Sequence, residues 1–365
     1  MPTARVSRRH PKEMSSRTNL GPGGAGLRFA IVGSSTLKGK ELTEIIPDGP
    51  LAAAEVRLLD DEETTGQLES VGEEMTFVQR VAADNFEGAD VVFFASDANF
   101  TKQNWHLATR AGSAVVDLSY GLENEKDASI RAPWIDGELG EVAPMNLQPG
   151  PVVVAHPAAV VLAVLMLRLK KLGAAKTVTC TIFEPASERG RKGLDELHQQ
   201  TVNILSFQSL PKDVYDAQIA FNLLATFGGN SQPTLASTEK RIVDHFKSVV
   251  RGEVSVPALM LLQASVFHGH AFSLYVEFPQ EVSLGDVAKA LAGEHLEIVH
   301  PPEEEAPSNV SAAGQEAILV QLRPDLEHKN GMWIWAAADN LRVLGLNAIG
   351  SAEQLVASRP RGQVQ

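Results

Sequence analysis

The sequence predicts a two-domain α/β protein, with a parallel-sheet unit first and an α+β unit after it. Three observations predict this class. Apolar strands alternate with helical patterns in the first half, which is typical of right-handed βαβ units. Strands of the second half alternate in polarity, as in a sheet with one more exposed face. A length of 365 residues is sufficient for two hydrophobic cores.

The first half begins with the apolar strand LRFAIVGSS, which runs into a turn of small residues. The helix LKGKELTEIIP follows and places Leu37, Leu42, Ile45 and Ile46 on one side. The segment EVRLLDDEE reads as a second strand with an acidic end. Two further buried strands, ADVVFFASD and AVVDLSYGL, flank the helical pattern TKQNWHLATRAG. These elements predict a parallel sheet.

The second half contains strands and amphipathic helices in irregular order. One helix, SLGDVAKALAG, has an N-cap at Ser283 and a stop at Gly293. The other predicted elements are the helices KGLDELHQQTVNILSF and STEKRIVDHFKSVVRG and the strands TVTCTIFEPAS, HAFSLYVEFPQEV and AILVQLRPD. The segment that starts at Gly331 reads as a strand and a closing helix. We expect domains over 27–155 and 156–330, with 331–365 completing the first.

Composition excludes several classes of function. The net charge of −13 argues against non-specific binding to nucleic acid or to an anionic membrane. The polar, basic start lacks the apolar segment of a signal peptide, so we expect 1–26 to be a disordered tail. The longest apolar run, 152–167, is short for a bilayer span. Cys180 is the one cysteine, which excludes an intrachain disulfide and fits a reducing cytoplasm. No metal site is predicted.

Six stretches resemble, in order and spacing, segments of the aspartate-semialdehyde dehydrogenase family. FAIVGSSTLKGKEL resembles its opening V-A-I-V-G-A-T-G-A-V-G, and AGSAVVDLSYGLE resembles A-G-x-x-V-I-D-N-S-S-A-F-R. HGHAFSLYVEF resembles G-H-S-E-A-V-N-V-E-F, and WAAADNLRVLGLNAI resembles W-V-V-A-D-N-L-R-K-G-A-A-L-N-A-V. GADVVFFASDANFTK and FEPASERGRKGLDELHQQT also have counterparts. The resemblance extends from about Leu27 to about Val356.

This resemblance implies a Rossmann-type nucleotide-binding domain that is completed by the C-terminal helix. It implies a second domain whose large mixed sheet carries the dimer interface. The family reaction is the NADPH-dependent reduction of an aspartyl phosphate to its semialdehyde. We therefore expect a homodimer, and a heteromer with an active paralogue is the alternative.

The family nucleophile is missing. The stretch VVVAHPAAVV resembles the strand-to-helix turn that reads N-P-N-C-S/T-T in the family, and the cysteine position is Ala159. A methyl group cannot form a thioester. Cys180 lies four residues before Glu184 on one strand, about 13 Å away along an extended chain, so it is a poor substitute. His270 aligns with the family base, and without a thiol we expect it to be vestigial, with a structural role.

The resemblance places cofactor binding in the first loop, at Gly33, Ser34, Ser35, Thr36, Leu37 and Gly39. Glycines let backbone approach a pyrophosphate, and Thr36 replaces the middle one, which restricts the backbone and adds bulk. The residues that hold a 2′-phosphate in the family become Asp61 and Glu63. Carboxylates repel that phosphate, while Asp61 can bond a ribose hydroxyl, so NAD is favoured over NADP. A turn that binds no nucleotide and a solvated acidic strand end are the alternatives.

The substrate contacts of the family are also altered. Its phosphate-binding and carboxylate-binding arginines become Glu123 and Gln263, which removes two planar anion-binding groups. Arg241 keeps a positive charge and could still bind an anion, but its acidic helix partner becomes His245. A glutamine and a glycine of the family site become Glu184 and Glu188, whereas Ser187 and Gly190 are retained.

These replacements favour a catalytically degenerate relative with a binding, scaffold or regulatory role. Core-forming stretches still match the family, whereas the site stretches do not. The alternative is an NAD(P)-dependent oxidoreductase of amino-acid biosynthesis that acts on a semialdehyde or a related molecule. In that case His270 would act as acid and base, and Asp61 would select NAD.

Overall fold

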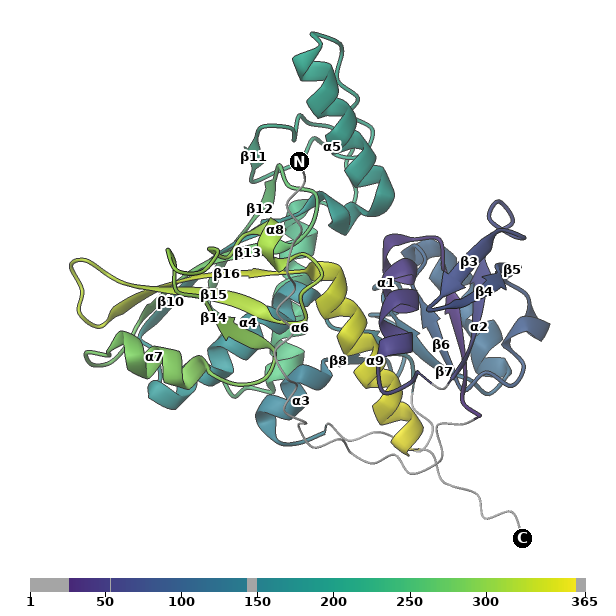
Figure 1. Ribbon diagram of the computed structural model, residues 1–365, viewed down its shortest axis with the longest axis horizontal. Helices are drawn as coiled ribbons and strands as arrows, with labels where there is room; N and C mark the ends of the chain where they lie inside the picture. The colour runs from purple at the N-terminus through teal and green to yellow at the C-terminus, as the bar shows by residue number, and fades with distance from the viewer. Residues whose placement is uncertain (1–25, 53, 143–149, 359–365) are drawn as a thin grey trace, which may run out of the picture.

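A computed structural model describes residues 26–52, 54–142 and 150–358. The predicted tail over 1–26 lies outside the described residues except for Gly26. Two seven-stranded sheets form the molecule, and the long C-terminal helix α9 (Asn340–Ser358) runs between them (Figure 1). This arrangement confirms the predicted α/β class.

The first sheet is entirely parallel, with strand order β5-β2-β1-β6-β7-β9-β8. Its strands are β1 (Arg28–Val32), β2 (Glu55–Asp60), β5 (Gln79–Arg80), β6 (Val91–Phe94), β7 (Ala114–Asp117), β8 (Ser129–Arg131) and β9 (Val152–Val154). The four central strands of the predicted pattern are all present. A separate hairpin of β3 (Leu68–Val71) and β4 (Glu74–Phe77), which the sequence pattern did not indicate, follows β2.

Helices cover both faces of this sheet. One core joins Phe29 and Ile31 of β1 to α1 (Leu37–Ile45) and α9, and the other packs α2 (Ala98–Arg110) against the opposite face. The C-terminal helix α9 therefore shares the core of the first sheet. Strand β16 (Gly331–Ala338), however, pairs in the second sheet. The sequence analysis grouped residues 331–365 with the first domain, whereas β16 at the start of that segment belongs to the second sheet.

The second sheet is mixed and has the order β11-β12-β10-β13-β16-β15-β14. Its other strands are β10 (Thr177–Glu184), β11 (Leu223–Leu224), β12 (Ala258–Ala264), β13 (His270–Glu277), β14 (Leu296–Ile298) and β15 (Ile318–Pro324). Strands β10 and β12 run parallel, whereas β10 and β13 run antiparallel. The carboxyl end of β10 therefore lies beside the amino end of β13, where His270 begins the strand.

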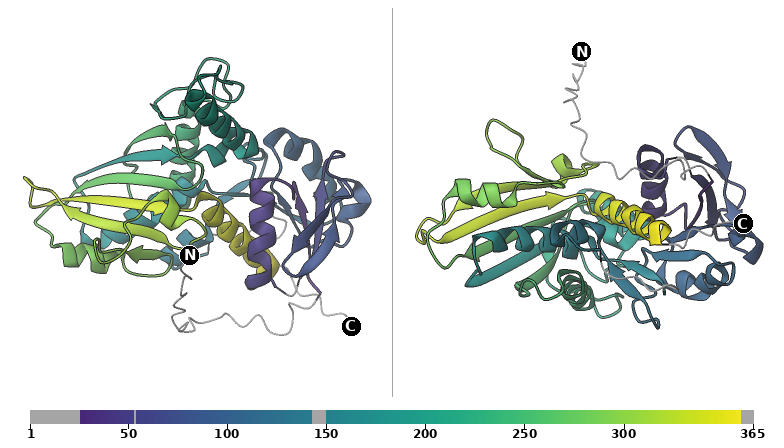
Figure 2. Two further views of the ribbon diagram at one scale, coloured as in Figure 1. Left: turned by 45° about the horizontal axis from the view of Figure 1, so that its top comes forward. Right: turned by 90° about the horizontal axis from the view of Figure 1, so that it is seen from below.

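One face of the second sheet packs against helices in the largest core of the molecule. The helix α4 (Pro157–Leu169) is buried at every position, which explains its apolar sequence. Figure 2 shows the second sheet with helices along one side. The remaining helices are α3 (Pro133–Leu139), α5 (Gly190–Leu205), α6 (Leu235–Val250), α7 (Leu284–Leu291) and α8 (Asn309–Ala312), with short 3-10 segments at Ile46–Asp48, Ala83–Phe86, Lys170–Leu172 and Ala186–Arg189.

Helix α5 projects from the second domain as an arm (Figure 1). At its carboxyl end, Leu205 and Phe207 are 69% and 98% exposed. Among the described residues, no helix is long and apolar enough to cross a membrane.

Candidate functional site

The first turn of α4 holds the position that resembles the family nucleophile. His156 is the N-cap, and its Nδ1 accepts a hydrogen bond of 3.2 Å from the amide of Ala158. Pro157 follows at the first helical position, where its missing N–H is not needed. Ala159 is fully buried, and its amide donates to the carbonyl of His156. A methyl group therefore occupies a position in the first turn of the helix, where the N-terminal dipole would have stabilised a thiolate.

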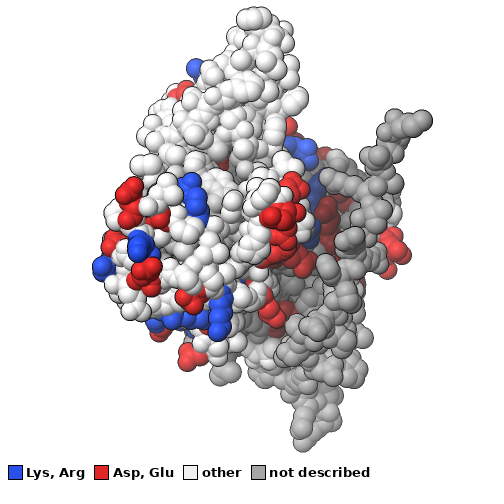
Figure 3. Space-filling view, turned by 60° about the vertical axis from the view of Figure 1, so that its left-hand side comes forward, with Lys and Arg blue, Asp and Glu red and all other residues white. Residues whose placement is uncertain are grey.

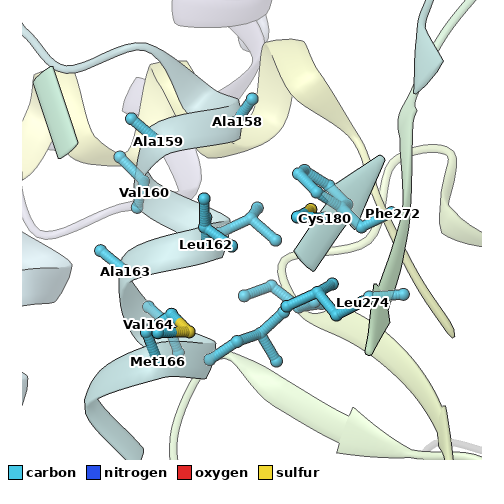
Figure 4. Close-up of a cluster of buried hydrophobic side chains, with 14 of the residues drawn as sticks. Ala158, Ala159, Val160, Leu162, Ala163, Val164, Met166, Cys180, Phe272 and Leu274 are labelled. Atoms are coloured by element: carbon cyan, nitrogen blue, oxygen red, sulfur yellow. The ribbon is translucent and has the colours of Figure 1, made fainter. Parts of the chain in front are cut away.

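Cys180 does not take over this role. It is 3% exposed and belongs to the core between β10 and α4, beside Phe272 and Leu274 (Figure 4). Burial raises the pKa of its thiol, so the nucleophilic thiolate is disfavoured. Cys180 is therefore a core residue, which supports the expectation that it is a poor substitute nucleophile.

His270 lies at the start of β13 and is 1% exposed. Its Nε2 is 3.9 Å from Oε1 of Glu188, which is beyond hydrogen-bond distance. Neither ring nitrogen has a hydrogen-bond partner among the described residues. Burial lowers its pKa, although the nearby Glu188 opposes the shift, so the ring is neutral at neutral pH. The contacts give no support to a structural hydrogen-bonding role for His270.

Glu188 is the centre of a small hydrogen-bond network. Asn340, the first residue of α9, donates to Oε1 of Glu188 over 2.7 Å. The side-chain oxygen of Asn340 accepts from the hydroxyl of Ser187 and from the amide of Gly269. Oε2 of Glu188 lies 3.6 Å from Nε2 of His156. The carboxylate of Glu188 therefore lies beside three other segments of the chain, which carry His156, His270 and Asn340.

Three buried histidines lie close together here. The rings of His156 and His270 are 5.7 Å apart, and the backbone amide of His156 donates to Nδ1 of His245 over 2.9 Å. Burial, with the adjacent His270 and His245, holds the pKa of His156 well below its usual range. Within the described part of the chain, no group of three or more His, Cys, Asp or Glu is arranged to hold a metal ion.

The site also contains cations that are already partnered. Arg241 of α6 forms an ion pair and hydrogen bond with Glu123. Its guanidinium lies 5.0 Å from the ring centre of Tyr120, and the ammonium of Lys38 lies 4.7 Å from the same centre. Burial by itself would raise the pKa of the Glu123 carboxyl. His245 and Arg241 outweigh burial and hold that pKa below its usual range. The positive charge of Arg241 is therefore compensated internally, which argues against the predicted anion-binding role.

Lys38 connects this cluster to the first loop, because its ammonium donates to the carbonyl of Leu118 over 2.6 Å. The loop itself is tightly packed. A Cβ on Gly33, whose φ is +84°, would lie 2.5 Å from the amide nitrogen of Ser96, and one on Gly39 would lie 2.2 Å from the carbonyl oxygen of Gly33. Both outer glycines are therefore required by the strand-turn-helix packing itself.

Thr36 is the N-cap of α1 and has ordinary extended angles, φ −72° and ψ 167°. Its hydroxyl donates toward the carbonyls of Gly33 and Ala95 and accepts from the amide of Gly39. The sequence predicted that the Thr36 side chain would add bulk near a bound phosphate. In the structure its hydroxyl bonds to groups of the loop and its surroundings instead. The first-turn amides of Leu37 and Lys38, which have no acceptor within the helix, remain as phosphate donors.

Two further loop atoms bear on nucleotide binding. The amide of Ser35 donates to the carboxylate of Asp60 over 2.9 Å. The hydroxyl of Ser34 is buried and has no partner among the described residues. Free helix amides and an unpaired hydroxyl fit a phosphate group, so the loop suits the pyrophosphate of a dinucleotide, which would supply hydride chemistry when bound.

Asp61 makes its hydrogen bonds within its own turn, to the amides of Glu63 and Thr64 and the hydroxyl of Thr64. Asp60, one residue earlier, is buried at the end of β2 and contacts the loop directly. Asp60 is therefore in direct contact with the phosphate loop, next to the predicted Asp61.

The structure brings several of the altered substrate-site residues together, whereas the predicted cofactor residues stay in the first loop and the turn after β2. Glu123, Arg241 and His245 contact one another, as do Glu184 and Gln263. Sequence reasoning missed Tyr120, Lys38 and Asn340 as site residues. Asn340 stood within the quoted segment WAAADNLR, and that match was the available signal. Tyr120 carries a positive φ of 62°, which no sequence pattern indicated.

A parallel dinucleotide-type sheet, a mixed-sheet domain and a polar cluster at their junction define a two-domain protein of the dehydrogenase type. The chain matches the family models "Semialdehyde dehydrogenase, NAD binding domain" over residues 28–141 and "Semialdehyde dehydrogenase, dimerisation domain" over 166–343. It is 30% identical over 334 residues to the USG-1 protein homolog of Azotobacter vinelandii, covering 90% of this chain and 97% of that one.

Two further comparisons agree. Aspartate-semialdehyde dehydrogenase of Rickettsia bellii is 25% identical over 333 residues, covering 90% of this chain and 97% of that one. The solved structure of a probable aspartate-semialdehyde dehydrogenase from Pseudomonas aeruginosa superposes with a TM-score of 0.77 at 27% identity, covering 90% and 98%. The chain belongs to the aspartate-semialdehyde dehydrogenase family, and its N-terminal domain is of the NAD(P)-binding type.

Proposed function

We propose that this chain keeps the architecture of its family but does not perform thioester chemistry, and acts as a binding, scaffold or regulatory protein. The observation that carries the proposal is the fully buried methyl of Ala159 in the first turn of α4. Covalent aldehyde chemistry requires a thiolate at such a position. Cys180 is in the core and its raised pKa disfavours the thiolate, so it offers no replacement.

The charge arrangement supports the same proposal. An anionic substrate needs an uncompensated cation, and Arg241 is paired with Glu123. Gln263 stands in place of the second arginine and donates to backbone carbonyls. Both anion-binding positions are thus occupied by internal contacts.

Our proposal for the cofactor is that the loop binds NAD in preference to NADP, and a turn without nucleotide is the alternative. Four consecutive acids, 60–63, stand at the end of β2 and directly after it, and would repel a 2′-phosphate. Asp60 and Asp61 are the candidates for a ribose hydroxyl. We further propose a homodimer, with a heteromer containing an active paralogue as the alternative.

A second candidate is an NAD(P)-dependent oxidoreductase that uses no covalent intermediate and acts on a semialdehyde or related molecule. The ring of His270 favours it, because it is neutral and has no hydrogen-bond partner among the described residues. A neutral imidazole can accept a proton during hydride transfer.

An activity assay separates the two candidates. The purified chain is tested for reduction of aspartyl phosphate and for oxidation of aspartate semialdehyde, with NADP and with NAD, by nicotinamide absorbance. We expect no turnover, and none in Ala159→Cys, because the anion contacts are still absent. An active family member is the positive control. Turnover by the unaltered chain would contradict the proposal, and recovery in Ala159→Cys would show that the thiol alone was lacking.

A further inference from the structure

Three side chains form a row across adjacent strands of the second sheet. Gln263 on β12 is in register with Glu184 on β10. Phe183 pairs with Ala271, which places His270 on β13 beside Glu184. All three side chains lie on the sheet face that packs against α4 and α6, and neighbouring strands are about 5 Å apart.

The row contains five buried polar atoms without a hydrogen-bond partner in the described part of the molecule. They are Oε1 of Gln263, both carboxylate oxygens of Glu184 and both ring nitrogens of His270. Each of the three residues is at most 1% exposed. Because buried polar atoms are usually satisfied, such a concentration indicates a missing partner.

The chemistry of these atoms defines that partner. Nε2 of Gln263 donates to the carbonyls of Glu184 and Ala264, each at 2.9 Å, so Oε1 is left as an acceptor. When Glu184 is ionised it supplies two acceptors, and neutral His270 supplies one acceptor and one donor. Nη1 of the neighbouring Arg189 is also buried without a partner among the described residues and adds a second donor. Four acceptors against two donors favour a ligand rich in N–H groups. No residue set in the described ranges is arranged as a metal site, so an N–H cation is favoured over a metal ion.

The neighbouring charged groups do not hydrogen-bond to Glu184 among the described residues, although Arg189 and Arg241 partly compensate its charge. Glu188 is bonded to Asn340, and Arg241 is paired with Glu123. Arg189 donates to the carbonyl of Pro233 and lies 4.7 Å from the ring centre of Phe227. Among the described residues, neither guanidinium hydrogen-bonds to Glu184.

We propose that Gln263, Glu184 and His270 form a subsite for the primary ammonium group of a small molecule. An ammonium carries three N–H donors and one positive charge, which match the acceptors and the carboxylate. The inference deepens the proposed binding role of this site and rests on it.

Calorimetric titration with n-butylammonium tests the proposal, with n-butanol and butanoate as neutral and anionic probes of similar size. We expect heat of binding from n-butylammonium alone. Glu184→Gln, which keeps the shape but removes the charge, should bind it at least about 10-fold more weakly, because a charge-assisted hydrogen bond is lost. Glu281→Gln, which alters an exposed carboxylate before α7, should bind like the unaltered chain.

Proton release gives a second readout, because burial raises the pKa of Glu184 to about 8, with a further contribution from Glu188. Binding of a cation near pH 7 should expel that proton, so the heat should depend on the ionisation enthalpy of the buffer. This readout needs only the unaltered chain, and it decides the question if Glu184→Gln does not fold.

Three results would overturn the inference: no binding of n-butylammonium, equal binding of n-butanol or butanoate, or unchanged affinity in Glu184→Gln. If the unaltered chain shows neither thioester turnover nor n-butylammonium binding, only this inference is overturned and the proposed function stands. Turnover in the assay above overturns the proposed function, whatever the ammonium result.

Discussion

At the scale of single residues, Glu184 makes the stability of the fold depend on pH. Burial, and then repulsion from Glu188, raise its pKa from 4.5 to about 8. The folded chain therefore binds more protons than the unfolded chain between these two values. The contribution of Glu184 to stability is therefore greatest below about pH 4.5 and decreases as the pH rises toward 8, by at most ~1.4 kcal/mol per pH unit.

Glu184→Gln removes this titration. We expect the variant to gain stability relative to the unaltered chain as the pH rises from near 5 to near 8, in urea unfolding measured at each pH. Glu41, whose pKa burial raises to about 7, titrates in the same window but is present in both proteins and cancels in the difference. A difference between the two proteins that does not change with pH would show that Glu184 is charged throughout.

The sequence alone showed which residue types occupy much of the site, but it did not show which of them contact one another. Ala159, Glu123 and Gln263 stand where family motifs place reactive groups, so their replacement was visible in the sequence. The pairing of Arg241 with Glu123 bridges 118 positions, and no local pattern encodes such a contact. Lys38 reads as an ordinary helix-surface lysine, and it becomes a site residue only because the first domain brings it to Tyr120.

At the scale of elements, the first loop is held together by Thr36. Its hydroxyl joins the carbonyls of Gly33 and Ala95 and caps α1 through the amide of Gly39. Thr36→Val keeps the shape but loses every one of these bonds. We expect a loss of about 1–2 kcal/mol in the free energy of unfolding, measured by urea denaturation.

The matched control is Thr177→Val at the exposed start of β10. Valine suits a strand, so this change should alter stability by less than about 0.5 kcal/mol. Equal effects in the two variants would mean that the cap at Thr36 contributes nothing beyond the generic cost of replacing threonine.

Most elements were predictable because their signals are local. Alternation of strand and helix predicted the parallel sheet, and Ser283 does cap α7 through the amide of Asp286. The place of β16 was not predictable in the same way. Its sequence indicates a strand, but its pairing with β13 and β15 is set by contacts across the whole second domain.

At the scale of the whole molecule, apolar side chains stay exposed on the second domain. They are Leu205, Phe207, Phe221, Leu223, Met260 and Phe267. Figure 3 shows a face on which the projecting arm carries few charged side chains. The matched dimerisation model, 166–343, includes all six positions. Apolar side chains are also exposed on the β3–β4 hairpin of the first domain, but only the second-domain set lies within the dimerisation model, which supports a dimer formed through this domain.

Met260 on β12 offers the sharpest test of that surface, because it is 54% exposed and lies within the dimerisation model. We expect the unaltered chain to sediment as a dimer and to melt at a higher temperature as its concentration rises. Met260→Lys would bury an unpaired charge on association, so it should weaken the dimer at least about 100-fold in sedimentation.

Met75→Lys is the matched control, since Met75 is 62% exposed on the β3–β4 hairpin of the first domain. An equal loss of dimer in both variants would point to a general effect of added charge rather than to an interface. A dimer that survives Met260→Lys unchanged would place the contact on another surface.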